Sequence, residues 1–218
     1  MGKILSRDSR NFHGWGYRRI VVAELQSFED VDDAGSKTVI GGASMLESEL
    51  AYTKKMIESN LSNFSAWHNR SKLIPQVLAQ RNATLEQRRM LFDDELVFLK
   101  SALLVDPYDQ SLWFYHQYLM SVLLVNSETD AWSIKFTNHD RIKYLEQEIS
   151  EIREVLVDTD DCKWVYQYLL QYTAGYMLIG GENKLVTTQD MCSWLAKLRT
   201  LDPLRQQRWN DLQKSLNL

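Results

Sequence analysis

The sequence predicts an all-α protein of stacked helical hairpins, and three observations support this fold class. A tryptophan motif recurs along the 218 residues. Apolar residues follow helical spacings of three and four, as in Ile142, Leu145, Ile149 and Ile152. No useful length of chain alternates apolar and polar residues as an exposed strand does. We therefore expect a right-handed superhelical solenoid, a crescent in which each hairpin stacks on the next.

The repeat motif reads Asn-Phe-His-Gly-Trp-Gly-Tyr-Arg at residues 11–18 and returns as Asn-Phe-Ser-Ala-Trp-His-Asn-Arg at residues 63–70. Two looser copies follow, each with an acidic residue four positions before its tryptophan, and a last copy at residues 205–209 keeps the tryptophan but loses the cap. The units centre on Trp15, Trp67, Trp113, Trp164 and Trp209, at intervals of 52, 46, 51 and 45 residues. We expect a single helical-repeat domain that covers residues 1–218.

The second helix of each unit is expected to begin at the motif. Asn and Asp are good N-cap residues because their side chains accept hydrogen bonds from the first backbone N–H groups of a helix. The expected caps are Asn11, Asn63, Asp109 and Asp160. Each tryptophan then falls one turn into its helix, where it points back at the preceding helix and packs in the core.

The first helix of several units carries its own start signal. Ser44, Thr84 and Thr187 each precede an acid or amide by three residues, which is close to the capping-box pattern. Between hairpins, residues 29–42 and 125–140 are polar and are expected to form loops. At the amino end we expect apolar side chains to be left partly uncovered; these are Ile4, Leu5 and the helix face of Ile20, Val21 and Val22.

Composition excludes several classes of function. The net charge of −4 and scattered basic residues do not indicate nucleic-acid binding. No window reaches the eighteen apolar residues that span a bilayer, so we expect a cytoplasmic protein that is not an integral membrane protein. Cys162 and Cys192 lie far apart, which favours two buried thiols over a metal site. His68 and His116 lack a second ligand at helical spacing, so we expect no metal in this chain.

Two groups of side chains leave alternatives open. Arg18 and Arg70 follow their tryptophans by three residues, and they could pair with carboxylates within the chain or at a subunit interface. An aromatic cluster is expected to be chiefly core, although an exposed part could receive an apolar side chain of a partner. Its members are Trp164, Tyr166, Tyr168, Tyr172 and Tyr176.

The motifs at 11–18 and 63–70, the Asp-Pro-Tyr-Asp-Gln-Ser-Leu-Trp-Phe-Tyr-His run at 106–116 and the ending at 201–209 resemble the alpha subunits of protein prenyltransferases. Among these, the chain is most similar to the Rab geranylgeranyltransferase branch, and the resemblance covers essentially all of its length. It implies a helical-hairpin crescent wrapped around a beta subunit that holds the zinc and the pocket for geranylgeranyl diphosphate. The complex would transfer geranylgeranyl groups to C-terminal cysteines of Rab GTPases presented by a Rab escort protein.

The resemblance also implies roles for particular residues. His13, with Phe12 beside it, matches a segment that faces the prenyl diphosphate in such enzymes. The repeat-motif residues would support the subunit interface; they are Asn11, Trp15, Arg18, Asn63, Trp67, Arg70, Asp109 and Trp113. The family's diphosphate-binding lysine lies in a repeat before the one at Asn11, so we assign no lysine here. We expect this chain to lack the N-terminal repeats and to be inactive alone.

The alternative hypothesis is a helical-repeat scaffold of the same fold that binds a protein without taking part in prenyl transfer. A repeat missing before Asn11 favours the scaffold, whereas the match across the remaining repeats favours the enzyme subunit.

Overall fold

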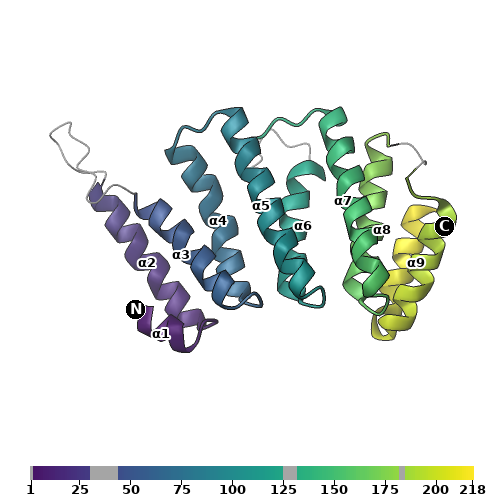
Figure 1. Cartoon of the computed structure of the whole chain (residues 1–218), viewed down its shortest axis with the longest axis horizontal. Coiled ribbons are helices and arrows are strands. Elements are labelled where there is room, and N and C mark those ends of the chain that lie inside the picture. The colour runs from purple at the N-terminus through teal and green to yellow at the C-terminus, as the bar shows by residue number, and fades with distance from the viewer. Residues whose placement is uncertain (1, 30–43, 125–131, 182–184) are drawn as a thin grey trace. The chain divides into compact units, whose positions relative to one another are not determined.

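A computed structural model of the chain describes residues 2–29, 44–124, 132–181 and 185–218 (Figure 1). Within these ranges every regular element is a helix, which confirms the all-α prediction. The helices are α1 (Gly2–Arg7), α2 (Phe12–Glu29), α3 (Met45–Ser59), α4 (Phe64–Gln80), α5 (Leu85–Val105), α6 (Gln110–Leu124), α7 (Asn138–Asp158), α8 (Lys163–Leu178), α9 (Thr188–Leu201), the short 3₁₀ helix η1 (Pro203–Arg205) and α10 (Gln206–Leu216).

The residues form two compact units, 1–91 and 92–218. In the first, α3 and α4 pack as a hairpin, and α2 contacts α3. In the second, α8 packs against α7, α9 and α6, and α9 packs against α10 (Figure 1). These pairs confirm the helical hairpins. The single domain, the crescent shape and the superhelical handedness stay predictions.

Each of the first three motif tryptophans bonds its indole N–H to the backbone carbonyl six residues earlier. The Nε1–O distances are 2.8 Å from Trp15 to Ser9, 2.8 Å from Trp67 to Leu61, and 2.7 Å from Trp113 to Pro107. All three side chains are buried, which confirms that they pack in the core. A buried indole N–H needs an acceptor, and here it takes one from the turn that enters its own helix.

The caps of these three helices agree with prediction. The Asn11 side chain accepts from the N–H of Gly14 at 2.7 Å, and Asn63 accepts from Ala66 at 3.1 Å. Asp109, which directly precedes α6, accepts from the N–H of Ser111 at 2.6 Å. Each cap residue lies four residues before its tryptophan and accepts a hydrogen bond from a backbone N–H group at the start of the helix.

The prediction for the fourth unit was wrong by two residues. Helix α8 begins at Lys163 with Cys162 as its N-cap, so Asp160 is not the cap. Four residues after that cap lies Tyr166, whose hydroxyl donates to the Asp160 carbonyl at 2.8 Å. Tyr166 therefore occupies the place held by tryptophan in the first three units, and Trp164 does not. The sequence misled because Trp164 also follows an acidic residue at the motif spacing.

The predicted starts of the first helices are confirmed. Ser44 caps α3, and Thr187 forms a full capping box with Asp190 at α9. The backbone N–H of Thr84 donates to the Gln87 side chain, and the Gln87 N–H donates back to the threonine hydroxyl. An unpredicted capping box starts α7 inside the expected loop 125–140, where Thr137 pairs with Asp140. The predicted loop at 29–42 lies outside the described residues, except that Glu29 ends α2.

The aromatic cluster of α8 is core. Its five members, Trp164, Tyr166, Tyr168, Tyr172 and Tyr176, are at most 7% exposed. Tyr168 also stacks on Trp113, with ring centroids 5.2 Å apart. These side chains offer no exposed part to a partner, so the docking alternative for the cluster was wrong.

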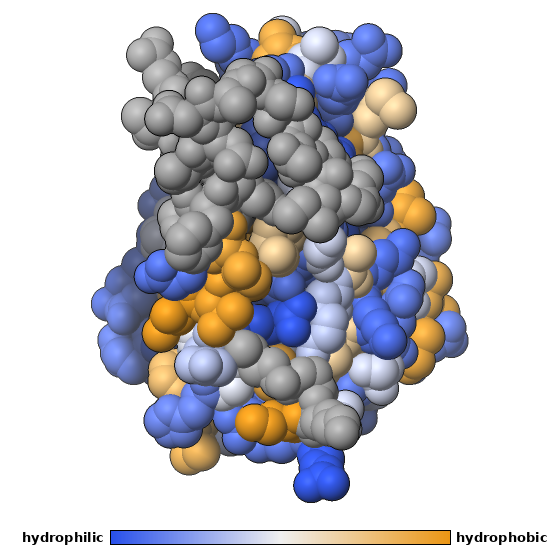
Figure 2. All heavy atoms as spheres, turned by 90° about the vertical axis from the view of Figure 1, so that its left-hand side faces the viewer, coloured by the Kyte–Doolittle hydropathy of each residue, from blue (hydrophilic) through white to orange (hydrophobic). Residues whose placement is uncertain are grey.

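The surface on the side of α1 and α2 carries apolar patches among hydrophilic side chains (Figure 2). Ile4 and Ile20 are 54% and 61% exposed, as expected for an uncovered amino end, whereas Leu5 is fully buried. Val21 and Val22 are half-buried. In the described part of the chain, no helix combines the length and hydropathy needed to cross a membrane.

We call the place of the motif tryptophan that bonds to the turn before its helix the anchor position. The assignment of Tyr166 to this position predicts that Tyr166→Phe lowers the free energy of unfolding by about 1 kcal/mol, the usual contribution of one hydrogen bond. Urea denaturation followed by circular dichroism measures the loss. Tyr17→Phe is the matched control, because this tyrosine is 60% exposed and such changes usually stay within about 0.5 kcal/mol. Equal stability of the two variants would refute the assignment.

Candidate functional site

The predicted diphosphate-facing pair lies in the first turn of α2, directly after the Asn11 cap. Phe12 is 75% exposed and His13 is exposed, and their rings lie edge to face with centroids 5.8 Å apart. The first N–H groups of a helix have no acceptor within it, and the helix dipole favours an anion there. This end of α2 therefore presents an imidazole and backbone donors together.

Two interactions hold the start of α2 in place. The Asn11 side chain caps it, and the indole of Trp15 bonds to the Ser9 carbonyl in the preceding turn. Gly14 packs closely at this helix start, because a Cβ there would lie 3.0 Å from the Leu5 side chain and 3.2 Å from Asn11 Oδ1. The exposed pair thus projects from a helix start that is fixed by buried contacts.

Three residues after the first tryptophan, Arg18 forms an ion pair with Glu49 of α3. Its Nε donates to Glu49 Oε2 at 2.6 Å, and its Nη2 contacts Oε1. The guanidinium also lies over the ring of Tyr52, 3.6 Å from the centroid. Planar stacking and a two-point carboxylate contact suit arginine better than lysine. Arg18 therefore takes the intrachain alternative that the sequence left open.

Arg70 occupies the same motif position in the next copy and is only 6% exposed. Its Nη1 donates to the Leu50 carbonyl at 3.1 Å and to the Thr53 hydroxyl at 3.3 Å, both on α3. This arginine also pairs within the chain. The motif residues as a group pack, cap and pair internally, and their expected contribution to a subunit interface stays a prediction.

In the third copy the position belongs to His116, for which the sequence indicated only the lack of a second metal ligand at helical spacing. The imidazole is 1% exposed. Its Nε2 lies 2.9 Å from Glu148 Oε2, and its Nδ1 lies 2.7 Å from the Tyr172 hydroxyl. His116 and Arg18 thus each pair with a glutamate on the following helix, so aligning the three motif copies is the signal that could have found this contact.

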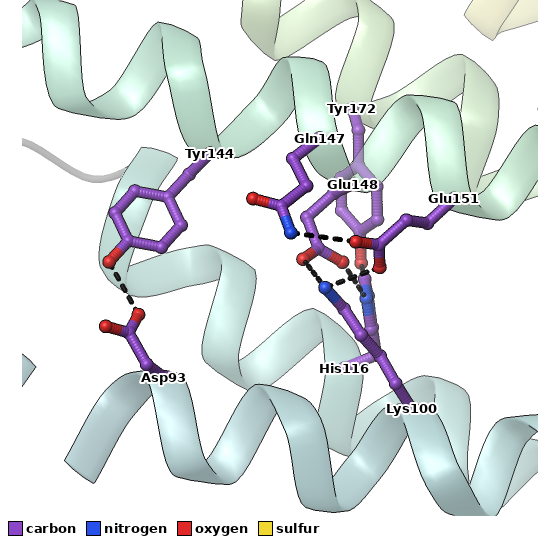
Figure 3. A network of polar contacts seen from close by, with 8 residues as sticks. All are labelled: Asp93, Lys100, His116, Tyr144, Gln147, Glu148, Glu151 and Tyr172. Carbon is purple, nitrogen blue, oxygen red and sulfur yellow. Dashed lines mark hydrogen bonds and ion pairs between the residues drawn. The ribbon is translucent and has the colours of Figure 1, made fainter. Parts of the chain in front are cut away.

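Glu148 is the centre of the network in Figure 3. Lys100 of α5 contacts the other carboxylate oxygen, with Nζ 2.6 Å from Glu148 Oε1 and 2.5 Å from Glu151 Oε2. Glu151 also accepts from Gln147 at 2.8 Å. Helices α5, α6, α7 and α8 all contribute side chains, so the network joins four helices of the second unit.

Both ring nitrogens of His116 have a hydrogen-bond partner in this network. Burial raises the pKa of Tyr172 well above its ordinary value, so the phenol keeps its proton. It can donate to Nδ1 of His116 while Nε2–H donates to Glu148, and it accepts instead when the imidazole is protonated. Burial opposes ionisation of Glu148, yet the hydrogen bond and charge of His116, with Lys100, hold the pKa of its carboxyl below the ordinary value.

No metal site is formed by the part of the chain that the structure describes, since no three His, Cys, Asp or Glu side chains cluster there. Cys162 is a free buried thiol whose Sγ donates to the Pro107 carbonyl at 3.2 Å. Cys192 is free and half-buried. The His116 and Glu148 side chains are at most 2% exposed, and we interpret the network around Glu148 as a structural element.

Glu148→Gln is expected to lower the free energy of unfolding by about 3 kcal/mol, because a half-buried lysine and a buried imidazole lose their anionic partner. Urea denaturation at pH 7 measures this loss. A carboxyl whose pKa is lowered on folding stabilises the native state above its unfolded pKa, about 4.3, and this gain is lost as the pH falls through the lower native value. The difference between wild type and variant should therefore shrink below about pH 4.

Glu151→Gln is the matched control, because Glu151 lies on the same helix and contacts the same lysine. Its carboxylate is 35% exposed, so the expected loss is below about 1 kcal/mol. Equal losses from the two variants would contradict the central place of Glu148.

Comparison with known proteins adds the evolutionary context of these repeats. The protein prenyltransferase alpha subunit repeat matches residues 46–77 and 92–123. The first match spans most of α3 and α4 with Trp67, and the second spans parts of α5 and α6 with Trp113. Both matched units therefore carry a tryptophan whose indole bonds to the turn before its helix.

Curated relatives resemble the chain along nearly its whole length. It is 35% identical to the geranylgeranyl transferase type-2 subunit alpha of Schizosaccharomyces pombe over 99% of this chain and 60% of that protein. The Saccharomyces cerevisiae protein of the same name is 28% identical over 96% of this chain and 58% of its own length. The Rattus norvegicus protein is 37% identical over 54% of this chain and 18% of its own length.

The chain spans about 60% of the length of the fungal relatives it matches. The repeat motif and the hairpin structure agree with the 35% identity to the Schizosaccharomyces pombe relative, which extends over 99% of this chain. The chain therefore carries two protein prenyltransferase alpha subunit repeats and is similar to geranylgeranyl transferase type-2 alpha subunits over nearly its whole length.

Proposed function

We propose that this chain acts as the alpha subunit of a type-2 protein geranylgeranyltransferase, in the cytoplasm and together with a beta subunit. The observation that carries this proposal is the 35% identity to a relative of that name across 99% of the chain. The buried tryptophans support it, because the motif residues that carry the resemblance make the same indole bond in three successive repeats.

The proposed reaction moves a geranylgeranyl group from geranylgeranyl diphosphate to C-terminal cysteines of Rab GTPases that a Rab escort protein presents. The cysteine thiolate attacks the allylic carbon, the carbon–oxygen bond to diphosphate breaks, and the diphosphate leaves with the electron pair. Zinc, which the family resemblance assigns to the beta subunit, would hold the thiolate. This chain contributes no ligand to it in our proposal, and we expect the chain alone to be inactive.

The role proposed for this chain's own site is to stabilise the leaving diphosphate. His13 and the free N–H groups at the start of α2 are donors of the kind that a departing anion requires. Phe12 borders them and would exclude water from the bound diphosphate. Asn11 and Trp15 act indirectly, because they fix the helix start from which the donors project.

Co-expression with a type-2 beta subunit tests the proposal. We expect a heterodimer on size-exclusion chromatography, and transfer of radiolabelled geranylgeranyl to a Rab protein only when the beta subunit and escort protein are both present. Failure to form the heterodimer would refute the enzyme hypothesis. A stable heterodimer without transfer would support the scaffold alternative.

His13→Ala should lower the transfer rate of the heterodimer by about 10-fold to 100-fold, because loss of one donor to a developing anion has effects of this order or larger. Single-turnover assays with saturating Rab and escort protein measure the rate. His139→Ala is the matched control, since His139 is an equally exposed histidine in the first turn of α7. If both variants retain the wild-type rate, His13 has no role in the transfer.

A further inference from the structure

A groove in the first unit adjoins the Arg18–Glu49 ion pair described above. Residues of α2, α3 and α4 line it, and its volume is about 200 Å³. One part of the lining is apolar, with Val22 and Ala23 on α2 and Leu73 on α4. Another part is cationic, with Arg18, Arg19 and Lys72. A ligand for this groove must therefore offer both an apolar group and a negative charge.

The cations of the groove are not equivalent. Glu49 neutralises Arg18 through the two-point contact described above. Arg19 and Lys72 have no carboxylate partner within the described parts of the chain. Among the lining residues Glu49 is the acidic side chain, and Arg18 already uses it. The groove thus keeps two positive charges that are open to an external anion.

Arg19 is positioned rather than loose. Its Nη1 donates to Asn69 Oδ1 at 3.1 Å, and Asn69 in turn donates from Nδ2 to the Ser65 carbonyl at 2.7 Å. Asn69 is only 6% exposed, so a buried amide tied to the helix backbone holds the guanidinium at the groove. A pre-positioned donor loses less entropy when it binds a carboxylate.

The pKa of the neighbouring His68 reflects the positive charge of these two side chains. Partial burial lowers the pKa of its imidazole most, and the positive charges of Lys72 and Arg19 lower it further. Both cations therefore act on one small region at the start of α4, independently of the groove's shape.

We propose that this groove binds an acidic segment of a partner protein, with a carboxylate between Arg19 and Lys72 and an adjacent apolar side chain against Val22 and Leu73. Charge complementarity selects the acid, and the apolar lining favours a peptide over a free inorganic anion. The proposal concerns α2 to α4 alone, so it can hold or fail whatever the outcome for prenyl transfer.

The probe is a fluorescein-labelled peptide with the core Leu-Glu-Leu-Glu flanked by Gly and Ser, titrated with the full chain at low ionic strength. Fluorescence anisotropy should show saturable binding. A peptide with Gln in place of Glu should bind with an affinity at least about fivefold lower. Arg19→Gln and Lys72→Gln should each weaken the acidic peptide about threefold to fivefold, as expected for partly exposed ion pairs. Added salt should weaken it too.

Lys55→Gln is the matched control, because it removes the same charge from an exposed residue of α3 that does not line the groove. It should leave the affinity unchanged, and circular dichroism confirms that each variant is folded. Equal binding of the Gln peptide, or equal loss in the Lys55 variant, would overturn the proposal. Full displacement by inorganic tripolyphosphate, with no advantage of Leu over Ser in the peptide, would identify a simple anion site instead.

Discussion

The hydrogen bond from each of the first three motif tryptophans to the carbonyl six residues upstream is the interaction on which these repeats depend. It ties the second helix of a unit to the turn that delivers it, so one side chain sets both the start and the entry angle of that helix. The indole also fills the core beside it, as its burial in three units shows. Tyr166 makes the same connection with a hydroxyl, which indicates that the constraint is the bond to the turn and not the indole itself.

The position three residues after the anchor shows how one place in a repeat can be satisfied in different ways. Arg18, half-buried, binds a glutamate and stacks on a tyrosine. Arg70, more deeply buried, reaches a carbonyl and a hydroxyl of the preceding helix. His116 replaces arginine where a buried tyrosine supplies a second partner. A buried polar group must have partners, and the neighbouring helices determine which ones are within reach.

Function and architecture use different parts of the same motif. The Asn and Trp of the first copy are committed to capping and packing, whereas Phe12 and His13, between them in sequence, project outward. The proposed diphosphate contact therefore depends on residues that the fold does not need. The second motif copy keeps the cap and anchor but has Ser65 in place of the histidine, which fits a site formed once among repeated units.

The sequence by itself determined the helical class, most helix starts and the core tryptophans, because spacing, caps and turn bonds act within a few residues of the chain. It also placed Phe12 and His13 at a helix start, since that position follows from the Asn11 cap. Only the tertiary structure decided that Tyr166 replaces Trp164, that Glu148 partners His116, and that Arg19 and Lys72 share one groove. The Glu148 contact and the groove depend on the distance between side chains on different helices, and the place of Tyr166 depends on where α8 begins, which the motif spacing misplaced.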